Sequence, residues 1–290
     1  MRREISVIQK ALQRADRKVK LTKTWINMHN TLGVGEIVGA SLILSTTDRD
    51  LLRDWVKNNA GIDPLSNDNL GDSRMDVALQ GRDEKLASGS VFGSMIQVAR
   101  ANGGAIDLTT GSATVPPGSL LSVDPDHLKV TRETIILVEN GAVMRDWHRL
   151  HLPDSLQSAL LIYRGHGENA ADVLKVLSEG GASNKIGFFD FDPAGLQMGL
   201  TAPVDALLIP AHWKSFTDDS PWVRDFNKPS AFWQQGGNLR YLDRQAPETL
   251  KPIIEHIREH LLALTQEHLV SHEIPLCILR FSPNFPGEET

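Results

Sequence analysis

The sequence is poor in cysteine and in long apolar runs. Cys277 is the one cysteine among 290 residues, which excludes an internal disulfide and a zinc site built from several cysteines. No apolar stretch approaches the roughly 18 residues that a membrane-spanning helix requires. The first residues lead into an amphipathic segment and not into the apolar run of a signal peptide. These absences predict a soluble, cytoplasmic protein without a membrane partner.

Positive charge is also scarce over most of the chain. The net charge is −6, which argues against a protein that coats nucleic acid. Residues 1–23, however, contain eight bases and two acids, a local charge of +6 that leaves −12 for the remainder. We expect Arg14, Arg17 and Lys18 in this basic segment to contact DNA phosphates. The alternative is a solvated helix face with no ligand.

The first 125 residues show helical periodicity and one hairpin pattern. Apolar residues from Ile5 to Val19 recur at helical spacing, and a second helix is expected from Asp48 to Asn59, ended by Gly61. A third is expected from Val91 to Ala101, after a long loop at 62–90. Short apolar runs at 105–108 and 113–115 predict a hairpin. Helices followed by a small hairpin predict a winged-helix-like region over 1–125 that docks DNA or a protein partner.

Beyond residue 130 strands and helices alternate. Strands are expected at 134–138, 159–163, 186–189 and 206–209, with helices at 143–150, 169–178 and 193–200. This order predicts an α/β domain over 130–290 whose parallel sheet is covered by helices on both faces. Residues 228–271 are expected to add further helices. The boundary between the domains is expected near 124–133.

Three acids follow two of these strands. Glu139 ends the first strand and precedes Asn140, and the third strand delivers Asp190 and Asp192. Residues two apart on a strand point to one face, so both aspartates can reach one cation. If the first and third strands are neighbours, all three carboxylates converge, and their repulsion then requires a cation. The structural alternatives are an Asp192 cap before Pro193 and a Glu139 that merely faces solvent at a turn.

The second strand ends in Tyr-Arg-Gly-His-Gly. Its two glycines permit close approach of the backbone to a phosphate, which Arg164 or His166 could contact. A glycine-rich turn alone is a weak signal. Its position beside the acids makes it a candidate phosphate site.

Together these motifs resemble a Toprim domain, the metal-binding fold of topoisomerases, bacterial primases and several nucleases. Within that fold the Val-Glu-Asn strand end, the Arg164–Gly167 turn and the Phe-Asp-Phe-Asp-Pro-Ala-Gly segment are most similar to the nuclease subunit (JetD-like) of Wadjet-type SMC plasmid-defence systems. The resemblance covers approximately 130–270. That subunit is related in turn to the topoisomerase VI A subunit.

The resemblance implies a Mg²⁺-dependent DNA endonuclease in which Glu139, Asp190 and Asp192 hold the metal and Mn²⁺ can substitute. It also implies that Gln266 and Glu267 lie close to the site, with Asn140 and Glu267 beside the metal ligands. Its partners would be DNA and an SMC-like ATPase complex, in a homodimer associated with the nucleoid.

Tyrosine is nearly absent, and this marks a departure from the topoisomerase VI relatives. Those enzymes cleave DNA with a tyrosine ahead of the Toprim domain. This chain has only Tyr163 and Tyr241, so no tyrosine precedes the expected catalytic domain. Cleavage is therefore expected to use water activated by a metal and no tyrosyl intermediate.

Three other functions compete with a nuclease. A noncatalytic DNA-binding or assembly subunit with a Toprim fold would not need the three acids. An Asp-x-Asp phosphohydrolase of the haloacid-dehalogenase type carries its motif on the first strand and leaves Glu139 unexplained. The segment from His256 to His260 fits the H-x-x-E-H pattern of inverted zinc proteases, although a solvated helix face explains it better.

Overall fold

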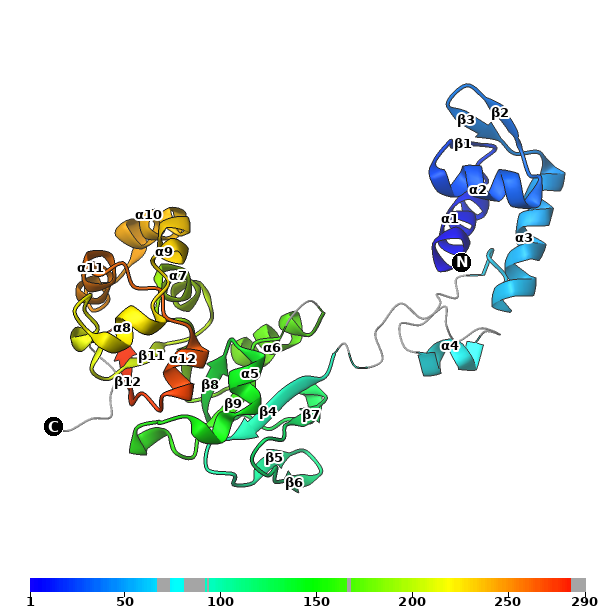
Figure 1. Ribbon diagram of the computed structural model, residues 1–290. Helices are drawn as coiled ribbons and strands as arrows, with labels where there is room; N and C mark the ends of the chain where they lie inside the picture. The colour runs from blue at the N-terminus through cyan, green and yellow to red at the C-terminus, as the bar shows by residue number, and fades with distance from the viewer. Residues whose placement is uncertain (67–73, 81–91, 93, 166–167, 283–290) are drawn as a thin grey trace. The chain divides into compact units, whose positions relative to one another are not determined.

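Two compact units make up the protein. The computed structural model describes residues 1–66, 74–80, 92, 94–165 and 168–282, and contacts divide the chain into Met1–Gly93 and Ser94–Thr290 (Figure 1). The boundary expected near 124–133 lies inside the second unit. The reason is that residues before it supply two strands, β4 (Ile96–Arg100) and β7 (Leu121–Val123), to the same sheet as the strands that follow it.

The first unit combines helices with a small antiparallel sheet of order β1-β3-β2. Its elements are α1 (Arg2–Gln13), β1 (Lys18–Lys20), α2 (Lys23–Leu32), β2 (Glu36–Val38), β3 (Ser41–Ile43), α3 (Thr46–Ala60) and α4 (Arg74–Gln80). Helix α4 lies within the segment 62–90, which was expected to be a loop. That expectation was therefore wrong for seven residues.

Local sequence signals explain the two longer helices of this unit. Helix α1 buries Ile5, Ile8 and Leu12, as their spacing predicts, but it ends at Gln13 because the chain turns into β1, which contains Val19. The helix predicted from Asp48 to Asn59 is confirmed. It begins with a capping box in which the side chains of Ser45 and Asp48 each accept a hydrogen bond from the backbone N–H of the other residue. It ends before Gly61, its C-cap.

The second unit is built on a seven-stranded mixed sheet of order β12-β11-β10-β8-β9-β4-β7. Its central strands β8 (Thr134–Val138), β9 (Leu160–Tyr163), β10 (Asn184–Phe188) and β11 (Ala206–Pro210) are parallel, as predicted. Strands β4, β7 and β12 (Leu276–Arg280) run antiparallel to their neighbours. The predicted α/β class is confirmed, whereas the prediction of a purely parallel sheet was wrong.

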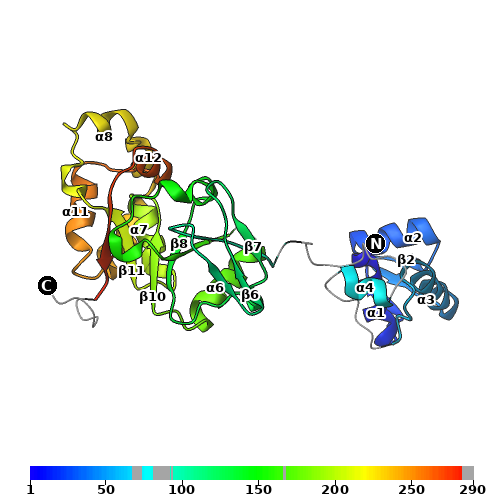
Figure 2. The ribbon, with the colours of Figure 1, turned by 90° about the horizontal axis from the view of Figure 1, so that it is seen from below.

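Helices cover both faces of this sheet (Figures 1 and 2). Helices α6 (Glu168–Glu179) and α7 (Pro193–Thr201) pack over Leu137 of β8 on one face. Helix α5 (Gly141–Arg145) lies on the other face and contacts α12 (Gln266–Ser271). Short 3₁₀ helices occupy 125–127, 147–149, 154–156 and 213–215. The apolar residues of β8 are almost fully buried because both faces are covered.

The chain between β11 and β12 is mostly helical, as predicted. It contains α8 (Pro221–Phe226), α9 (Pro229–Gln234), α10 (Gly236–Gln245), α11 (Lys251–Glu259) and α12. Helix α10 packs against α7. This helical insertion therefore reaches the carboxyl end of β10, where α7 begins.

The predicted winged-helix arrangement was wrong in its elements. The segment expected as a helix at 91–101 contains β4, which pairs with β7 and β9. The hairpin itself is confirmed as β5 (Ile106–Leu108) and β6 (Gly111–Ala113), but it belongs to the second unit. The helix predicted over 143–150 stops at Arg145 and is followed by the 3₁₀ turn at 147–149. Among the helices of the described ranges, none is long and apolar enough to cross a membrane.

Candidate metal and phosphate site

Polar residues from three strands meet at the carboxyl edge of the parallel sheet. Strand β8 lies between β10 and β9, and Val138 pairs with both Phe188 and Tyr163. Glu139, Arg164 and the Asp-x-Asp segment directly follow these strand ends. The prediction that the first and third strands are neighbours is confirmed. Ligands of open α/β sheets bind at this edge.

The middle residue of the Asp-x-Asp segment anchors it. Phe191 is 2% exposed, and its backbone pairs with Leu264, with N–H···O distances of 2.8 and 3.2 Å. Since alternate residues of an extended chain face opposite sides, burial of Phe191 directs Asp190 and Asp192 away from the side that it occupies. The Leu264 pairing also ties the segment to the helical insertion.

Asp190 is a partly buried acid among other acids. Its Oδ1 accepts a hydrogen bond of 2.8 Å from the backbone N–H of Gln266. Burial raises the pKa of Asp190 to about 7 against the lowering effect of that N–H, and the carboxylates of Asp192, Glu139 and Glu267 raise it further. A carboxyl that is half protonated near neutral pH is a marker of functional sites.

Asp192 is the N-cap of α7. Its Oδ1 accepts from the backbone N–H of Gly195 at 2.7 Å, and its Oδ2 accepts from Nε2 of Gln235 at 2.6 Å. Pro193 occupies the first helical position, so the structural role considered for Asp192 is confirmed. A Cβ on residue 195 would lie 2.0 Å from the carbonyl oxygen of Asp190. Only glycine therefore lets α7 begin this close to the acids.

Glu139 and Arg164 lie side by side. The backbone N–H of Arg164 donates to Val138 O at 2.8 Å, and the guanidinium Nη2 is 4.0 Å from Glu139 Oε1. The side chains are 25% and 38% exposed for Glu139 and Arg164, so a solvent-borne phosphate can reach both. The structure thus brings Arg164 to the acids, as expected, whereas His166 lies outside the described residues.

Asn140 joins β8 to α12. Its Oδ1 caps α5 through the N–H groups of Ala142 and Val143, and its Nδ2 donates to Glu267 Oε1 at 2.5 Å. The fully buried side chain of Gln266 accepts from the Asn140 N–H and donates to Phe188 O at 2.9 Å. Asn140 and Glu267 are therefore located beside the acids, as the resemblance implied.

The donor chemistry of the site suits a hard divalent cation. Carboxylate oxygens are the preferred ligands of Mg²⁺, which is usually bound by one or two carboxylates together with water and substrate phosphate. In the described part of the chain, no three His, Cys, Asp or Glu side chains converge closely enough to form a metal cage by themselves. Glu139, Asp190 and Asp192 therefore offer oxygen ligands of the type that Mg²⁺ prefers, and water or a bound phosphate would have to supply the remaining ligands.

The His256–His260 segment forms no zinc centre with the described residues. Nε2 of His256 lies 3.0 Å from the carbonyl oxygen of Phe216, and Nδ1 of His260 lies 2.6 Å from Oδ1 of Asp218. Each imidazole therefore has its own protein partner. The protease alternative gains no support from this geometry.

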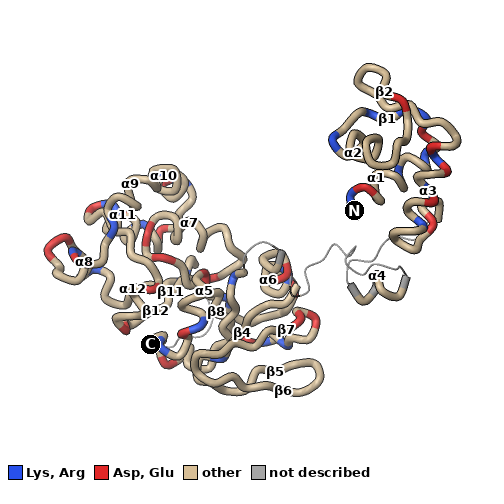
Figure 3. Tube along the Cα trace, turned by 45° about the vertical axis from the view of Figure 1, so that its right-hand side comes forward, with Lys and Arg blue, Asp and Glu red and all other residues tan. Residues whose placement is uncertain are grey.

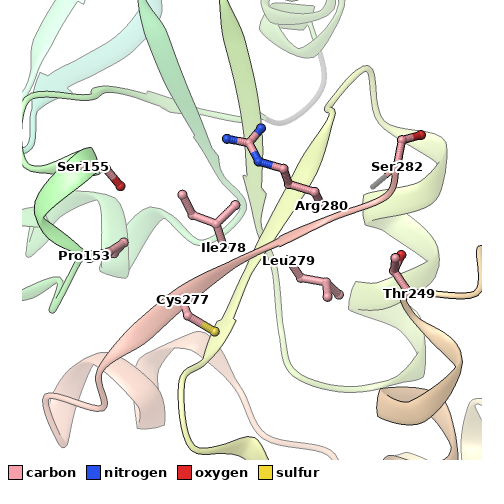
Figure 4. Close-up of a pocket in the computed structure, with 8 residues that line it drawn as sticks. All are labelled: Pro153, Ser155, Thr249, Cys277, Ile278, Leu279, Arg280 and Ser282. Carbon is pink, nitrogen blue, oxygen red and sulfur yellow. The ribbon is translucent and has the colours of Figure 1, made fainter. Parts of the chain in front are cut away.

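A separate cavity of about 490 Å³ follows the edge strand β12. In Figure 4, Cys277 and Leu279 extend to one side of β12 and Ile278 to the other. Pro153, Ser155, Thr249, Arg280 and Ser282 complete the lining. No carboxylate lines this cavity, so it is not the site of the acids.

The basic residues predicted to contact DNA belong to the first unit. Arg14, Arg17 and Lys18 are exposed, around the end of α1 and the start of β1 (Figure 3). Lys20 is exposed on the same face of β1 as Lys18 because the strand alternates. The structure thus shows an accessible basic surface in this unit.

One residue of the site had not been predicted. Gln235 contacts Asp192 and also accepts a hydrogen bond of 2.9 Å from the backbone N–H of Ala194. The Gln-Gln-Gly-Gly run at 234–237 was the only local signal, and neither periodicity nor strand ends indicate such a contact.

Comparison with known proteins places the second unit in a sequence family. Residues 93–278, more than half of the chain, match DUF7281, a domain of unknown function. The protein therefore belongs to the DUF7281 family. A search of curated proteins gave no match.

Proposed function

We propose that the protein is a Mg²⁺-dependent DNA endonuclease with a Toprim-type active site, acting as the cleaving subunit of an SMC-type anti-plasmid complex. The observation that carries the proposal is the meeting of Glu139, Arg164 and the Asp190–Asp192 segment at the carboxyl edge of the sheet, with carboxylates close enough to repel one another. Repulsion among these groups is relieved by a divalent cation, and hydrolysis of a phosphodiester is a reaction that such a site supports.

Each side chain has a role that its position allows. Glu139, Asp190 and Asp192 would hold Mg²⁺, for which Mn²⁺ can substitute. The bound ion would supply Lewis acidity that stabilises negative charge on the phosphate and lowers the pKa of water. Arg164, 4.0 Å from Glu139, would bind a nonbridging oxygen of the scissile phosphate. Glu139, whose side chain is 25% exposed, would accept the proton of the attacking water.

The first unit would hold DNA that flanks the cut. Its exposed Arg14, Arg17 and Lys18 can neutralise phosphates without reading sequence. Its helices and the small antiparallel sheet β1-β3-β2 support a DNA-binding role like that of a winged helix. These elements differ from the helix at 91–101 and the hairpin that were first expected to form it. A double-strand cut with one site per chain would require a homodimer.

Cleavage of supercoiled plasmid tests the proposal. Purified protein with Mg²⁺ or Mn²⁺ should nick or linearise the plasmid. Asp190→Ala should slow cleavage by about a hundredfold or more, because the variant lacks a proposed metal ligand. Asp126→Ala is the matched control because Asp126 is an exposed acid of the same unit. Intact plasmid in every lane, also with an added SMC partner, would contradict the nuclease.

A noncatalytic DNA-binding or assembly subunit is the second candidate. The specific observation in its favour is Asp192, both of whose oxygens already accept protein hydrogen bonds while it caps α7. This candidate predicts DNA binding that Asp190→Ala leaves unchanged and no cleavage under either metal. The same plasmid assay, combined with a gel-shift measurement, separates the two functions.

A further inference from the structure

A ring of three hydrogen bonds encloses the second aspartate of the site. Asp192 Oδ1 accepts from Gly195 N–H at 2.7 Å, Asp192 Oδ2 accepts from Gln235 Nε2 at 2.6 Å, and Gln235 Oε1 accepts from Ala194 N–H at 2.9 Å. Asp192 is only 7% exposed. One amide side chain thus binds the carboxylate and the first turn of α7 simultaneously.

This ring fixes the orientation of the carboxylate. An ionised carboxylate oxygen has two lone pairs, and each Asp192 oxygen uses one for a protein donor. A second lone pair remains on each oxygen for a cation. One donor belongs to the first turn of α7 and the other, Gln235, is itself held by the Ala194 N–H of that turn, so rotation of the Asp192 carboxylate about its Cβ–Cγ bond strains or breaks both hydrogen bonds.

We propose that Gln235 is a positioning residue that holds Asp192 ready to bind the divalent cation. The inference rests on the proposed function in that it assigns Asp192 to the cation. Hydrogen bonds from neighbouring side chains to ligating carboxylates orient the ligand, and their loss typically weakens metal affinity by about 10- to 100-fold. Gln235 touches the ligand and not the reacting atoms.

Glutamine is the residue that this position requires. Its side chain offers one donor and one acceptor on the same planar group, which matches one carboxylate oxygen and one backbone N–H. Glutamate would offer no donor to Asp192 and would add a negative charge. Asparagine is shorter by one methylene and cannot keep both hydrogen bonds at the present backbone distance.

Gln235 also explains why the helical insertion between β11 and β12 matters to the site. It lies between α9 and α10, and α10 packs against α7. The insertion also supplies the N–H of Gln266, which binds Asp190, and Leu264, whose backbone pairs with Phe191 between the two aspartates. The strand ends therefore carry the acids, and the insertion orients them.

Metal binding to the intact protein tests the inference without relying on cleavage. Mn²⁺ affinity is measured from the electron paramagnetic resonance signal of free Mn²⁺ and from the rise in melting temperature with added Mn²⁺. Gln235→Met keeps the length of the side chain and removes both polar atoms. We expect Mn²⁺ affinity to fall about 10- to 100-fold, with Gln235→Asn giving a smaller but measurable loss.

Asn238→Leu is the matched control. Nδ2 of Asn238 donates to Gln197 Oε1 at 2.9 Å, so this amide also ties α10 to α7 but contacts no carboxylate. A merely structural role for Gln235 predicts the same change in Mn²⁺ affinity in both variants. A double-mutant cycle also distinguishes positioning of Asp192 from a general structural role. If Gln235 acts through Asp192, Gln235→Met should have no further effect on Mn²⁺ affinity in an Asp192→Asn background.

The outcomes separate the inference from the proposed function. Equal Mn²⁺ affinity in the natural protein, Gln235→Met and Gln235→Asn would overturn the inference alone. Weaker binding in the Gln235 variants without any DNA cleavage would support it and count against the nuclease. A natural protein that binds no Mn²⁺ would overturn both.

Discussion

Two aspartates, one in each unit, have pKa shifts of opposite sign. Asp63 accepts hydrogen bonds from the Arg53 guanidinium at 2.6 and 3.0 Å and lies 3.1 Å from the Lys57 ammonium. Above all through the hydrogen bonds from Arg53, the pKa of Asp63 is lowered well below its usual range. Burial raises the pKa of Asp190 to about 7, and neighbouring carboxylates add to the increase.

The difference separates an acid whose charge is balanced by cations of its own unit from an acid whose neighbours repel its charge. Asp63 is a half-buried carboxylate between two cations, and these cations of its own unit neutralise it. Asp190 is a partly buried carboxylate beside three others, so its ionised form costs folding free energy. Sites of this second kind are where ligands act.

The largest expected effect is on the pH dependence of unfolding. Without metal, the raised pKa of Asp190 gives stability that is fully present below about 3.8, its ordinary value, and is lost as the pH rises through about 7. This difference in pKa corresponds to about 4 kcal/mol at most. Relative to Asp190→Asn, the natural protein should lose this amount between pH 4 and 7.5, measured by urea unfolding in EDTA.

Asp63→Asn provides the control of opposite sign. The lowered pKa of Asp63 gives stability that is present above the unfolded value and is lost as the pH falls. The variant should therefore be less stable than the natural protein near neutral pH, and the gap should narrow in acid. If Asp190→Asn were also less stable than the natural protein near neutral pH, with a gap that narrows in acid, the pKa of Asp190 would not be raised by its surroundings.

An intermediate effect is expected from the helix caps of the two units. Ser45→Ala and Asp192→Ala each remove an N-cap side chain, so each should lower the free energy of unfolding by about 0.5–2 kcal/mol in thermal or urea unfolding. Only Asp192→Ala should also abolish the stabilisation by Mn²⁺. Loss of that stabilisation in Ser45→Ala as well would mean that it reports general stability and not a ligand.

The smallest expected effect concerns DNA contact by the first unit. Arg17→Ala and Lys18→Ala should each reduce affinity for duplex DNA by a small factor. Each should also make the slope of log K against log salt less negative by about one, because each removes one phosphate contact. Fluorescence anisotropy at several salt concentrations measures both. Lys129 is an exposed base of the second unit, and Lys129→Ala should leave the slope unchanged. An equal change of slope in Lys129→Ala would mean that the first unit has no special part in DNA contact.

Local patterns predicted the elements that depend on neighbouring residues. The first turns of α1, the cap at Asp192 and the strand β8 are encoded within a few residues and lie where expected, whereas α1 ends at Gln13 and β10 begins two residues before the predicted strand. The strand β4 was mistaken for a helix. Its residues form a strand because β7 and β9 pair with both of its edges, which no local window contains.

The site shows the same division. Glu139, Asp190 and Asp192 were predicted as site residues because strand ends of an α/β sheet meet at one edge. Gln235 was missed because it is 43 residues from Asp192 in sequence and meets it only through the packing of α10 on α7.

By itself the sequence determined that acids follow the strands β8 and β10, that α7 begins at Pro193, and that positive charge is concentrated before residue 24. Only the tertiary structure decided that Asp190 is partly buried beside three carboxylates and that Gln235 binds Asp192. The physical reason is that charge is a property of each residue, whereas burial and orientation are imposed by segments distant in the chain.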